Sequence, residues 1–273
     1  MIAALQMYDW SEVQHLTDAF WSRVRKNLVN AGLNAPARLS RFDDIHAPWP
    51  DPSLLLGQTC GLPYVMGLAG EAQVIGRPCY GLPMASGGAY CSAVICRSDG
   101  AADLPGFKGA RAAVNSYVSQ SGCHALAAEV LATGLPTDEP FFNKVKITGS
   151  HRASAIAVAD GTADVAAIDA VAWALFQEIE PDQALRLHVV QWTPKTPGLP
   201  LITSKDNAPH ARMILSAIQN AASQTTDHET GVPRAVLPAD DQDYDAIREI
   251  AAFVRGMRLA PDAQVLGHTL PMV

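Results

Sequence analysis

The feature that most constrains the fold of this chain is a strand–turn–helix pattern that recurs between Val114 and Phe176. In each repeat a short apolar run is followed by a polar turn and then by apolar residues at helical spacing. Alternating strands and helices form a parallel sheet, because neighbouring parallel strands are joined by a crossover helix. We expect strands at 112–115, 144–148 and 164–168, each followed by a helix, within one α/β lobe.

The flanking parts of the chain predict a second α/β lobe. A short buried strand is expected at 2–7, an amphipathic helix at 11–31 and another buried strand at 54–56. Two further helices, at 208–222 and 240–255, have apolar positions three and four residues apart. We expect both of these helices to pack on the lobe that contains the N-terminal strand.

Two Pro-rich or Gly-rich segments mark the places where the chain is expected to cross between the lobes. One is 81–88, and the other is the proline-rich run 193–200, which cannot continue a strand or begin a helix at once. The sequence therefore predicts a discontinuous lobe 1, residues 1–85 plus 196–273, and a lobe 2, residues 86–195.

Composition limits the partners of the chain. Twenty Lys and Arg residues against 27 Asp and Glu give a net charge of −7, and no basic cluster is present, so a nucleic-acid partner is not expected. No apolar run approaches the roughly 20 residues that a membrane helix needs, so we expect no membrane span. The five cysteines are an odd number without paired spacing, which favours free thiols over a zinc site or a disulfide framework. We expect no metal, no cofactor and a monomer.

The N-terminal residues contain neither a basic segment nor a small-residue cleavage site of the kind found in signal peptides. On this ground the chain is expected to be cytoplasmic if Met1 is its native start. The alternative is an exported protein whose leader is missing from this sequence.

The tetrapeptide Ser119-Gln120-Ser121-Gly122 is the strongest candidate for a ligand site. It opens a predicted helix, where unpaired N–H groups and the positive end of the helix dipole favour an anion. The serine hydroxyls and the glutamine amide can donate hydrogen bonds to oxygen atoms, and Gly122 lets the backbone approach a ligand closely. The alternative is a serine that only caps the helix.

The next two strand ends carry further candidates. Gly149-Ser150-His151 lies at the equivalent point of the following strand–helix unit, and in a parallel sheet such turns are neighbours at the carboxyl edge. His151 could donate a hydrogen bond to an anion. Asp169 ends the strand after that, where it could cap a helix, accept from a ligand hydroxyl, amine or protonated oxygen, or orient His151.

In lobe 1, three polar residues also follow strands and are expected at carboxyl edges: Tyr8 after the first strand, and Gln58 and Thr59 after the strand at 54–56. Each of these residues is a candidate ligand contact. Their position would let them face the ligand if the two lobes oppose each other.

The usual catalytic signatures are missing, since the chain has no nucleophile elbow, phosphate loop, HExxH motif or dinucleotide fingerprint. A hydrolytic pair of a cysteine (Cys60 or Cys123) with a histidine (His124 or His151) stays open as an alternative. We therefore expect a binding protein and not an enzyme.

The chain resembles the phosphate/phosphite/phosphonate substrate-binding proteins of ABC transporters in four segments: LLLGQTCGLPY, VNSYVSQSGCHAL, TGSHRASAIAVADGTADVAAID and WTP…PGLPL. This resemblance implies the type II periplasmic-binding-protein fold, with two α/β lobes of mixed sheets joined by two crossing strands around a cleft. It also implies a solute-binding function in the periplasm, with a small phosphate-, phosphite- or phosphonate-like anion as ligand and an ABC permease as partner.

The resemblance also implies roles for individual residues. A Ser-Thr-Ser turn that holds the phosphonate oxygens in the family aligns with residues 119–121, and the family histidine aligns with His151. The acidic position aligns with Asp169, and two family tyrosines look like Tyr8 and Tyr90.

Gln120 departs from the family pattern, because an amide stands where the family has the middle hydroxyl. We expect this residue to set the ligand of this chain apart from the ligands of its relatives. Two alternatives stay open on the same scaffold: an enzyme, or a ligand-sensing protein, acting on a small phosphorylated or heterocyclic metabolite.

Overall fold

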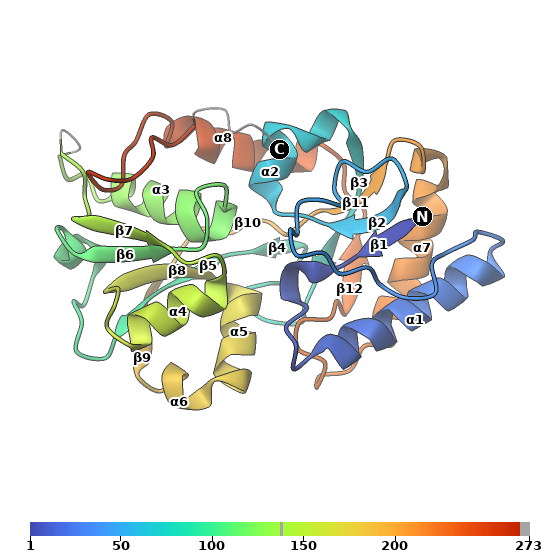
Figure 1. The fold of residues 1–273 in the computed structure, drawn as a ribbon, viewed down its shortest axis with the longest axis horizontal. Helices are drawn as coiled ribbons and strands as arrows, with labels where there is room; N and C mark the ends of the chain where they lie inside the picture. Colours follow the sequence, from blue (N-terminus) through green and yellow to red (C-terminus); the bar gives the residue numbers. More distant parts are fainter. Residues whose placement is uncertain (137–138, 268–273) are drawn as a thin grey trace. The chain divides into compact units, whose positions relative to one another are not determined.

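The computed structural model describes residues 1–136 and 139–267, which fold into two compact α/β units (Figure 1). The first unit comprises Met1–Ala89 and Pro197–Asp245, and the second comprises Tyr90–Thr196 and the chain from Ala246 onward. The chain changes unit within strand β4 (Ala89–Tyr90) and again within strand β10 (Thr196–Pro197), and these two strands pair with each other.

The first unit is built on a five-stranded mixed sheet with the strand order β1-β2-β11-β3-β12. β1 and β2 are parallel, whereas β11 runs antiparallel to both of its neighbours and β12 is antiparallel to β3. The bounds are β1 Ile2–Ala4, β2 Leu54–Gln58, β3 Ala72–Cys79, β11 Leu201–Ser204 and β12 Ala235–Leu237.

Two long helices, α1 (Gln14–Asn30) and α7 (Ala211–Ala222), supply most of the helical side of the first core. Phe20 and Trp21 of α1 and Ile218 of α7 are buried in one cluster with strand residues of the sheet. Helix α2 (Gly61–Met66) follows β2 directly. The prediction that a helix begins at Ser11 was wrong by one turn, because the Ser11 hydroxyl bonds Glu12 and leaves the helix start uncapped.

The second unit has a five-stranded mixed sheet with the order β7-β6-β8-β5-β9. The three strands β7, β6 and β8 are parallel, and β5 runs antiparallel to β8 and to β9. The bounds are β5 Ser92–Arg97, β6 Arg111–Val114, β7 Lys144–Ile147, β8 Val165–Asp169 and β9 Leu187–Trp192. The three predicted strands of this lobe are confirmed as neighbours in one sheet.

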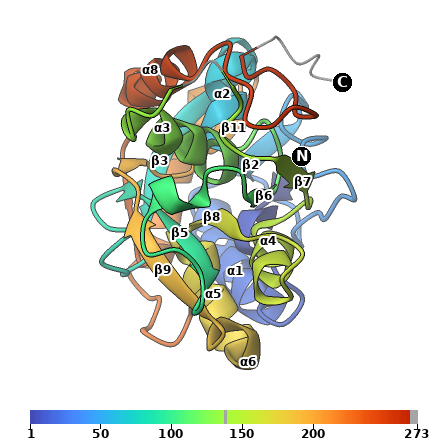
Figure 2. The same ribbon diagram turned by 90° about the vertical axis from the view of Figure 1, so that its left-hand side faces the viewer.

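Helices cover both faces of the second sheet. Helix α3 (Ala125–Ala132) lies on one face, and α4 (His151–Ala159) and α5 (Ala170–Ile179) lie on the other, as Figures 1 and 2 show from two directions. The short helix α6 (Pro181–Ala184) follows α5. The parallel strands and their crossover helices therefore bring three strand ends to one edge of this sheet.

The C-terminal part of the chain packs differently from the prediction. Residues after the start of α8 (Asp245–Phe253) belong to the second unit, where Val254, Leu259 and Leu266 are buried beside Phe142. The Phe142 N–H also donates to the Leu259 carbonyl at 2.9 Å. Helical periodicity gave the amphipathic face of this helix but not the sheet that the following chain covers.

Candidate functional site

The carboxyl ends of β6, β7 and β8 form one edge of the second sheet, and a helix starts after each of them. β6 lies between the other two strands, with Val114 opposite Ile147 and Ala113 opposite Ala166. The two turns that follow β6 and β7 are also joined directly, because the Gly149 N–H donates to the Asn115 carbonyl at 3.0 Å. The prediction that these two turns are neighbours is confirmed.

The first turn is buried and wound more widely than an α-helix. Residues Gln120–His124 form a single π-helical turn ahead of α3, and Ser119 caps it by accepting from the Gly122 N–H at 3.0 Å. Ser119, Gln120 and Ser121 are all buried. Because the Ser119 oxygen acts as acceptor in the cap, its own proton stays available to donate to another group.

Gly122 is required by the packing of this turn. A β-carbon at this position would overlap the Asn115 Oδ1 atom and come within 3.2 Å of the His151 ring carbon Cε1. Asn115 was not among the predicted site residues, although it directly follows β6. Its Oδ1 atom is buried and has no hydrogen-bond partner within residues 1–136 and 139–267. A buried acceptor without a partner at a strand end is typical of functional sites.

The second turn delivers a histidine to the first. Gly149 has a positive φ of 86°, and Ser150 caps α4 by accepting from the Ala153 N–H at 3.1 Å. His151 is the first residue of α4, and its Nε2 atom lies 2.9 Å from the Ser121 Oγ atom. Ser150 itself is exposed, in contrast to the serines of the first turn.

His151 is uncharged at neutral pH in the unliganded protein. Burial lowers the pKa of its imidazole, while the charge of Asp169 and the backbone carbonyl of Ala167 raise it, and the net direction is downward. Since the ordinary pKa of histidine is about 6.5, a lowered value leaves the ring neutral at pH 7.

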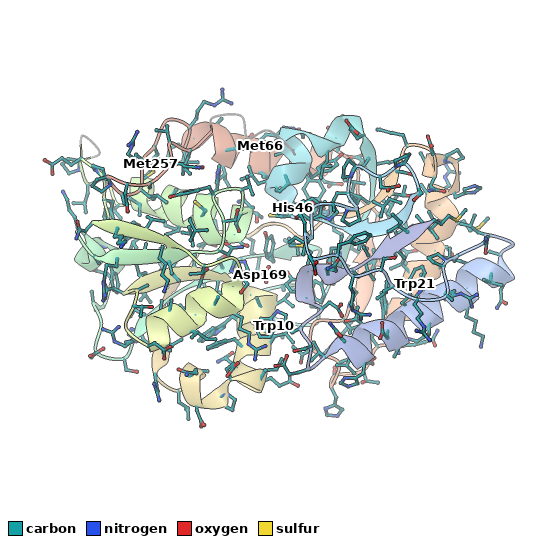
Figure 3. The ribbon with its side chains drawn as sticks, viewed as in Figure 1. Trp10, Trp21, His46, Met66, Asp169 and Met257 are labelled. Carbon is teal, nitrogen blue, oxygen red and sulfur yellow. The ribbon has the colours of Figure 1, made fainter. Side chains whose placement is uncertain are left out.

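Asp169 takes the helix-cap position at the third strand end and is labelled in Figure 3. Its Oδ1 atom accepts from the N–H groups of Val171 at 2.7 Å and Ala172 at 3.1 Å, at the start of α5. The residue is buried and lies opposite Ser92 in the neighbouring strand β5. The cap interpretation of Asp169 is confirmed, and its charge also acts on His151.

A positive charge near this edge was missed from sequence. Burial raises the pKa of the Cys91 thiol, and the charge of Lys195 lowers it while that of Asp169 raises it. Lys195 and Asp169 therefore both act on one buried thiol. Lys195 lies in the proline-rich run that precedes β10, where periodicity carries no information about side-chain direction.

The predicted residues of the first unit also lie close to one another. Tyr8 packs edge-on against Tyr80 with ring centroids 5.2 Å apart, and Gln58 Nε2 donates to the Tyr80 hydroxyl at 2.6 Å. Thr59 is fully buried, and its hydroxyl donates to the Cys60 carbonyl at 3.2 Å. Tyr80, which follows strand β3, joins Tyr8 and Gln58 and was not among the predicted residues. Tyr90, in β4, is buried.

The cysteine–histidine pair at Cys123 and His124 is poorly suited to nucleophilic catalysis. Burial raises the pKa of the Cys123 thiol to about 12 and lowers the pKa of His124 to about 4. The thiol therefore stays protonated at neutral pH, and the reactive form of cysteine is the thiolate. All five cysteines are free thiols.

Within the described ranges, no group of three or more His, Cys, Asp or Glu side chains is arranged to hold a metal ion. Over the same ranges, no helix has the length and apolar character needed to cross a membrane.

The fold recurs in solved structures of low sequence identity. PhnD1 from Prochlorococcus marinus in complex with methylphosphonate has a TM-score of 0.70 at 17% identity, over 88% of this chain and 93% of that chain. A binding-protein component of an ABC phosphonate transporter from Pseudomonas aeruginosa has a TM-score of 0.69 at 18% identity, over 93% and 85%. A Xanthomonas citri protein bound to ATP has a TM-score of 0.67 at 16% identity, over 92% and 95%.

These structures have the type II periplasmic-binding-protein fold, and the fold of the present chain is therefore of this type. No curated protein sequence matches the chain. A family model described as the periplasmic substrate-binding protein of phosphonate ABC transporters matches residues 56–244, which is well over half of the sequence. The chain belongs to this family of phosphonate ABC transporter substrate-binding proteins.

Proposed function

We propose that this protein binds a small phosphate-, phosphite- or phosphonate-like anion at the edge formed by β6, β7 and β8, and does so without chemical turnover. The observation that carries the proposal is the hydrogen bond between Ser121 and His151, which joins two helix starts at adjacent strand ends. Helix N-termini are favourable positions for an anion, because their first N–H groups lack partners within the helix.

The donors at this edge suit an oxyanion. The Ser119 and Ser150 oxygens both accept from backbone N–H groups, so their protons are available to donate outward. We propose that the ligand oxygens are bound by the donors Ser119, Gln120, Ser121, Gly122, Ser150 and His151, with Asp169 as the acidic residue of the site. Tyr8, Gln58, Thr59 and Tyr90 stay predicted ligand contacts.

Transport is the role that the family supports. We propose a periplasmic protein that acts as a monomer and delivers its ligand to an ABC permease. The related protein from Prochlorococcus marinus was solved with methylphosphonate, which makes this compound the first ligand to test. Gln120 is fully buried in the turn that replaces the family's hydroxyl-rich turn, and we propose that it shifts ligand preference within the class of phosphorus oxyanions.

A thermal-shift screen tests the binding proposal. The compounds are phosphate, phosphite, methylphosphonate, aminoethylphosphonate and sulfate, each at a concentration that would saturate a specific site. A ligand at about 100 times its dissociation constant stabilises the folded state by about 2.7 kcal/mol, which gives a clear rise in melting temperature. A flat response to all the phosphorus compounds would contradict the proposal.

Paired variants connect the shift to the site. Ser121→Ala and His151→Ala are expected to reduce the stabilisation by the ligand. Two exposed or surface positions of helix α1, Ser22→Ala and His15→Ala, are the matched controls and are expected to leave the shift unchanged. Equal ligand responses in all four variants would exclude these turns from the site.

Mass spectrometry separates binding from catalysis. Each compound that stabilises the protein is incubated with it and then analysed for products. We expect the compound to be recovered intact, and a product that depends on the protein would show an enzyme on the same scaffold.

A further inference from the structure

The polarity of the hydrogen bond between Ser121 and His151 links anion binding to a proton. The two atoms, Ser121 Oγ and His151 Nε2, lie 2.9 Å apart, and either can be the donor. If the serine donates to the ring, its proton is used inside the protein and the hydroxyl offers only lone pairs to a ligand. If the ring donates, the serine keeps its proton for the anion.

The second ring nitrogen restricts this choice. Nδ1 of His151 is buried and has no hydrogen-bond partner in the described part of the chain. The Ala167 carbonyl favours the protonated ring but lies outside ordinary hydrogen-bond geometry with Nδ1. A neutral imidazole carries one proton, so it can place an N–H toward Ser121 or toward the buried side, but not both. Only the imidazolium places a proton on both nitrogens.

Asp169 supplies the countercharge on the protein side. Its charge favours the protonated form of His151, and its carboxylate is held by the Val171 and Ala172 N–H groups. This carboxylate alone does not overcome the burial of the ring in the unliganded protein, because the net shift of the pKa is downward. A bound anion would add a second negative charge beside Nε2.

The other charged groups on the elements around α4 are paired or lie at other parts of the helix. Arg152 of α4 pairs with Glu180, its Nε atom lying 2.9 Å from Oε1. Arg97 of β5 reaches Val158, near the far end of α4, and Arg111 of β6 pairs with Asp164. On the first turn, Cys123 and His124 are both uncharged at neutral pH. Lys195 acts on Cys91, beside Asp169.

We propose that the anion and one proton bind together, with the proton on His151, so that a Ser121–imidazolium pair held by Asp169 forms only in the liganded protein. This inference rests on the proposed function of the same edge. It gives Asp169 the role of a positioning residue, which acts on the ligand through His151. It also gives Ser121 a hydroxyl proton that points to the ligand in the bound state.

The sign of the pH dependence follows from linkage. The free protein has a histidine whose pKa lies below the usual value of about 6.5, and the bound anion raises that pKa. Between the two values the free protein must take up a proton to bind, so the dissociation constant rises about tenfold for each unit of pH increase. Below the free value this dependence disappears.

Isothermal titration calorimetry with methylphosphonate in buffers of different ionisation enthalpy counts the protons taken up. The wild-type protein, His151→Gln and Asp169→Asn are compared at each pH from 5 to 8, so that protons taken up by methylphosphonate itself cancel in the comparison. We expect the wild type to take up more protons than His151→Gln, by up to one per site. Asn is as good a helix cap as Asp, so Asp169→Asn should keep the fold while its affinity begins to fall at a lower pH than in the wild type.

A second readout covers a His151→Gln variant that does not fold or bind. The ring proton signals of His151 in the wild-type protein are followed by NMR across the same pH range, with and without methylphosphonate. We expect the midpoint to move upward on binding by at least one pH unit. An unchanged or lower midpoint, or equal proton uptake in wild type and His151→Gln, would overturn the coupling while leaving the proposed binding function intact. Absence of binding at every pH would instead contradict the proposed function.

Discussion

The two helix starts that meet at Ser121 and His151 share a cap but differ in burial. Ser119 and Ser150 each accept a hydrogen bond from a backbone N–H three residues later. The first turn is buried and begins with a π-helical turn, whereas Ser150 is exposed and α4 begins as a regular α-helix. The same local motif therefore serves two ends: the first turn presents its backbone and hydroxyls, and the second mainly positions His151.

The two glycines of these turns show why the difference matters. Gly122 has no room for a β-carbon, because Asn115 occupies that space. Gly149 has open space around it and is required only by its positive φ. Tight packing thus fixes the geometry of the first turn, whereas backbone conformation alone fixes the second.

The largest expected effect comes from replacing these glycines. Gly122→Ala should abolish anion binding and lower the free energy of unfolding by about 3 kcal/mol, because the new methyl group overlaps the Asn115 side chain. Gly149→Ala should cost about 1 to 2 kcal/mol through its left-handed backbone conformation. Urea unfolding and calorimetric titration measure both quantities. Equal losses in the two variants would show that packing does not distinguish the turns.

The burial of the first turn also predicts a response to acid. His124 closes the π-helical turn, and burial lowers its pKa to about 4, whereas the unfolded chain has an ordinary value near 6.5. Because the unfolded state binds the proton first, stability contributed by the neutral ring is lost as pH falls from about 6.5 to 4, by about 3 kcal/mol in total.

His124→Gln, which cannot be protonated in this range, should show a smaller loss of unfolding free energy on acidification. His15→Gln, at an exposed position of α1, is the control and should behave like the wild type. Urea unfolding of the ligand-free proteins at pH 6.5 and pH 4.5 makes the comparison. The same acid response in wild type and His124→Gln would contradict the burial argument.

The smallest pair of effects separates the two serines. Ser121→Ala removes a donor that we place against a charged ligand, a bond of about 1.5 to 3 kcal/mol, so affinity should fall about 10- to 100-fold. Ser150→Ala removes the cap of α4 and should lower stability by about 1 kcal/mol, with the smaller effect on affinity. Titration calorimetry and thermal unfolding of both variants test the contrast. A larger affinity loss in Ser150→Ala would reverse the roles assigned to the turns.

The sequence predicted most of this edge because its signals are local. Strand–turn–helix alternation placed Ser121, His151 and Asp169 at adjacent strand ends, and the cap residues followed from side-chain chemistry. The π-helical turn, the fit of Asn115 against Gly122 and the charge of Lys195 depend on tertiary contacts that no local pattern encodes. The C-terminal segment was assigned to the wrong unit for the same reason, since an amphipathic helix does not specify which core it covers.

The most direct test of the account is the amide NMR spectrum of the assigned protein during titration with methylphosphonate. If the anion binds at the helix starts after β6 and β7, the N–H signals of residues 119–124 and 149–152 shift most and saturate together. Saturable shifts confined to other parts of the chain, or none at all, would contradict the proposed site.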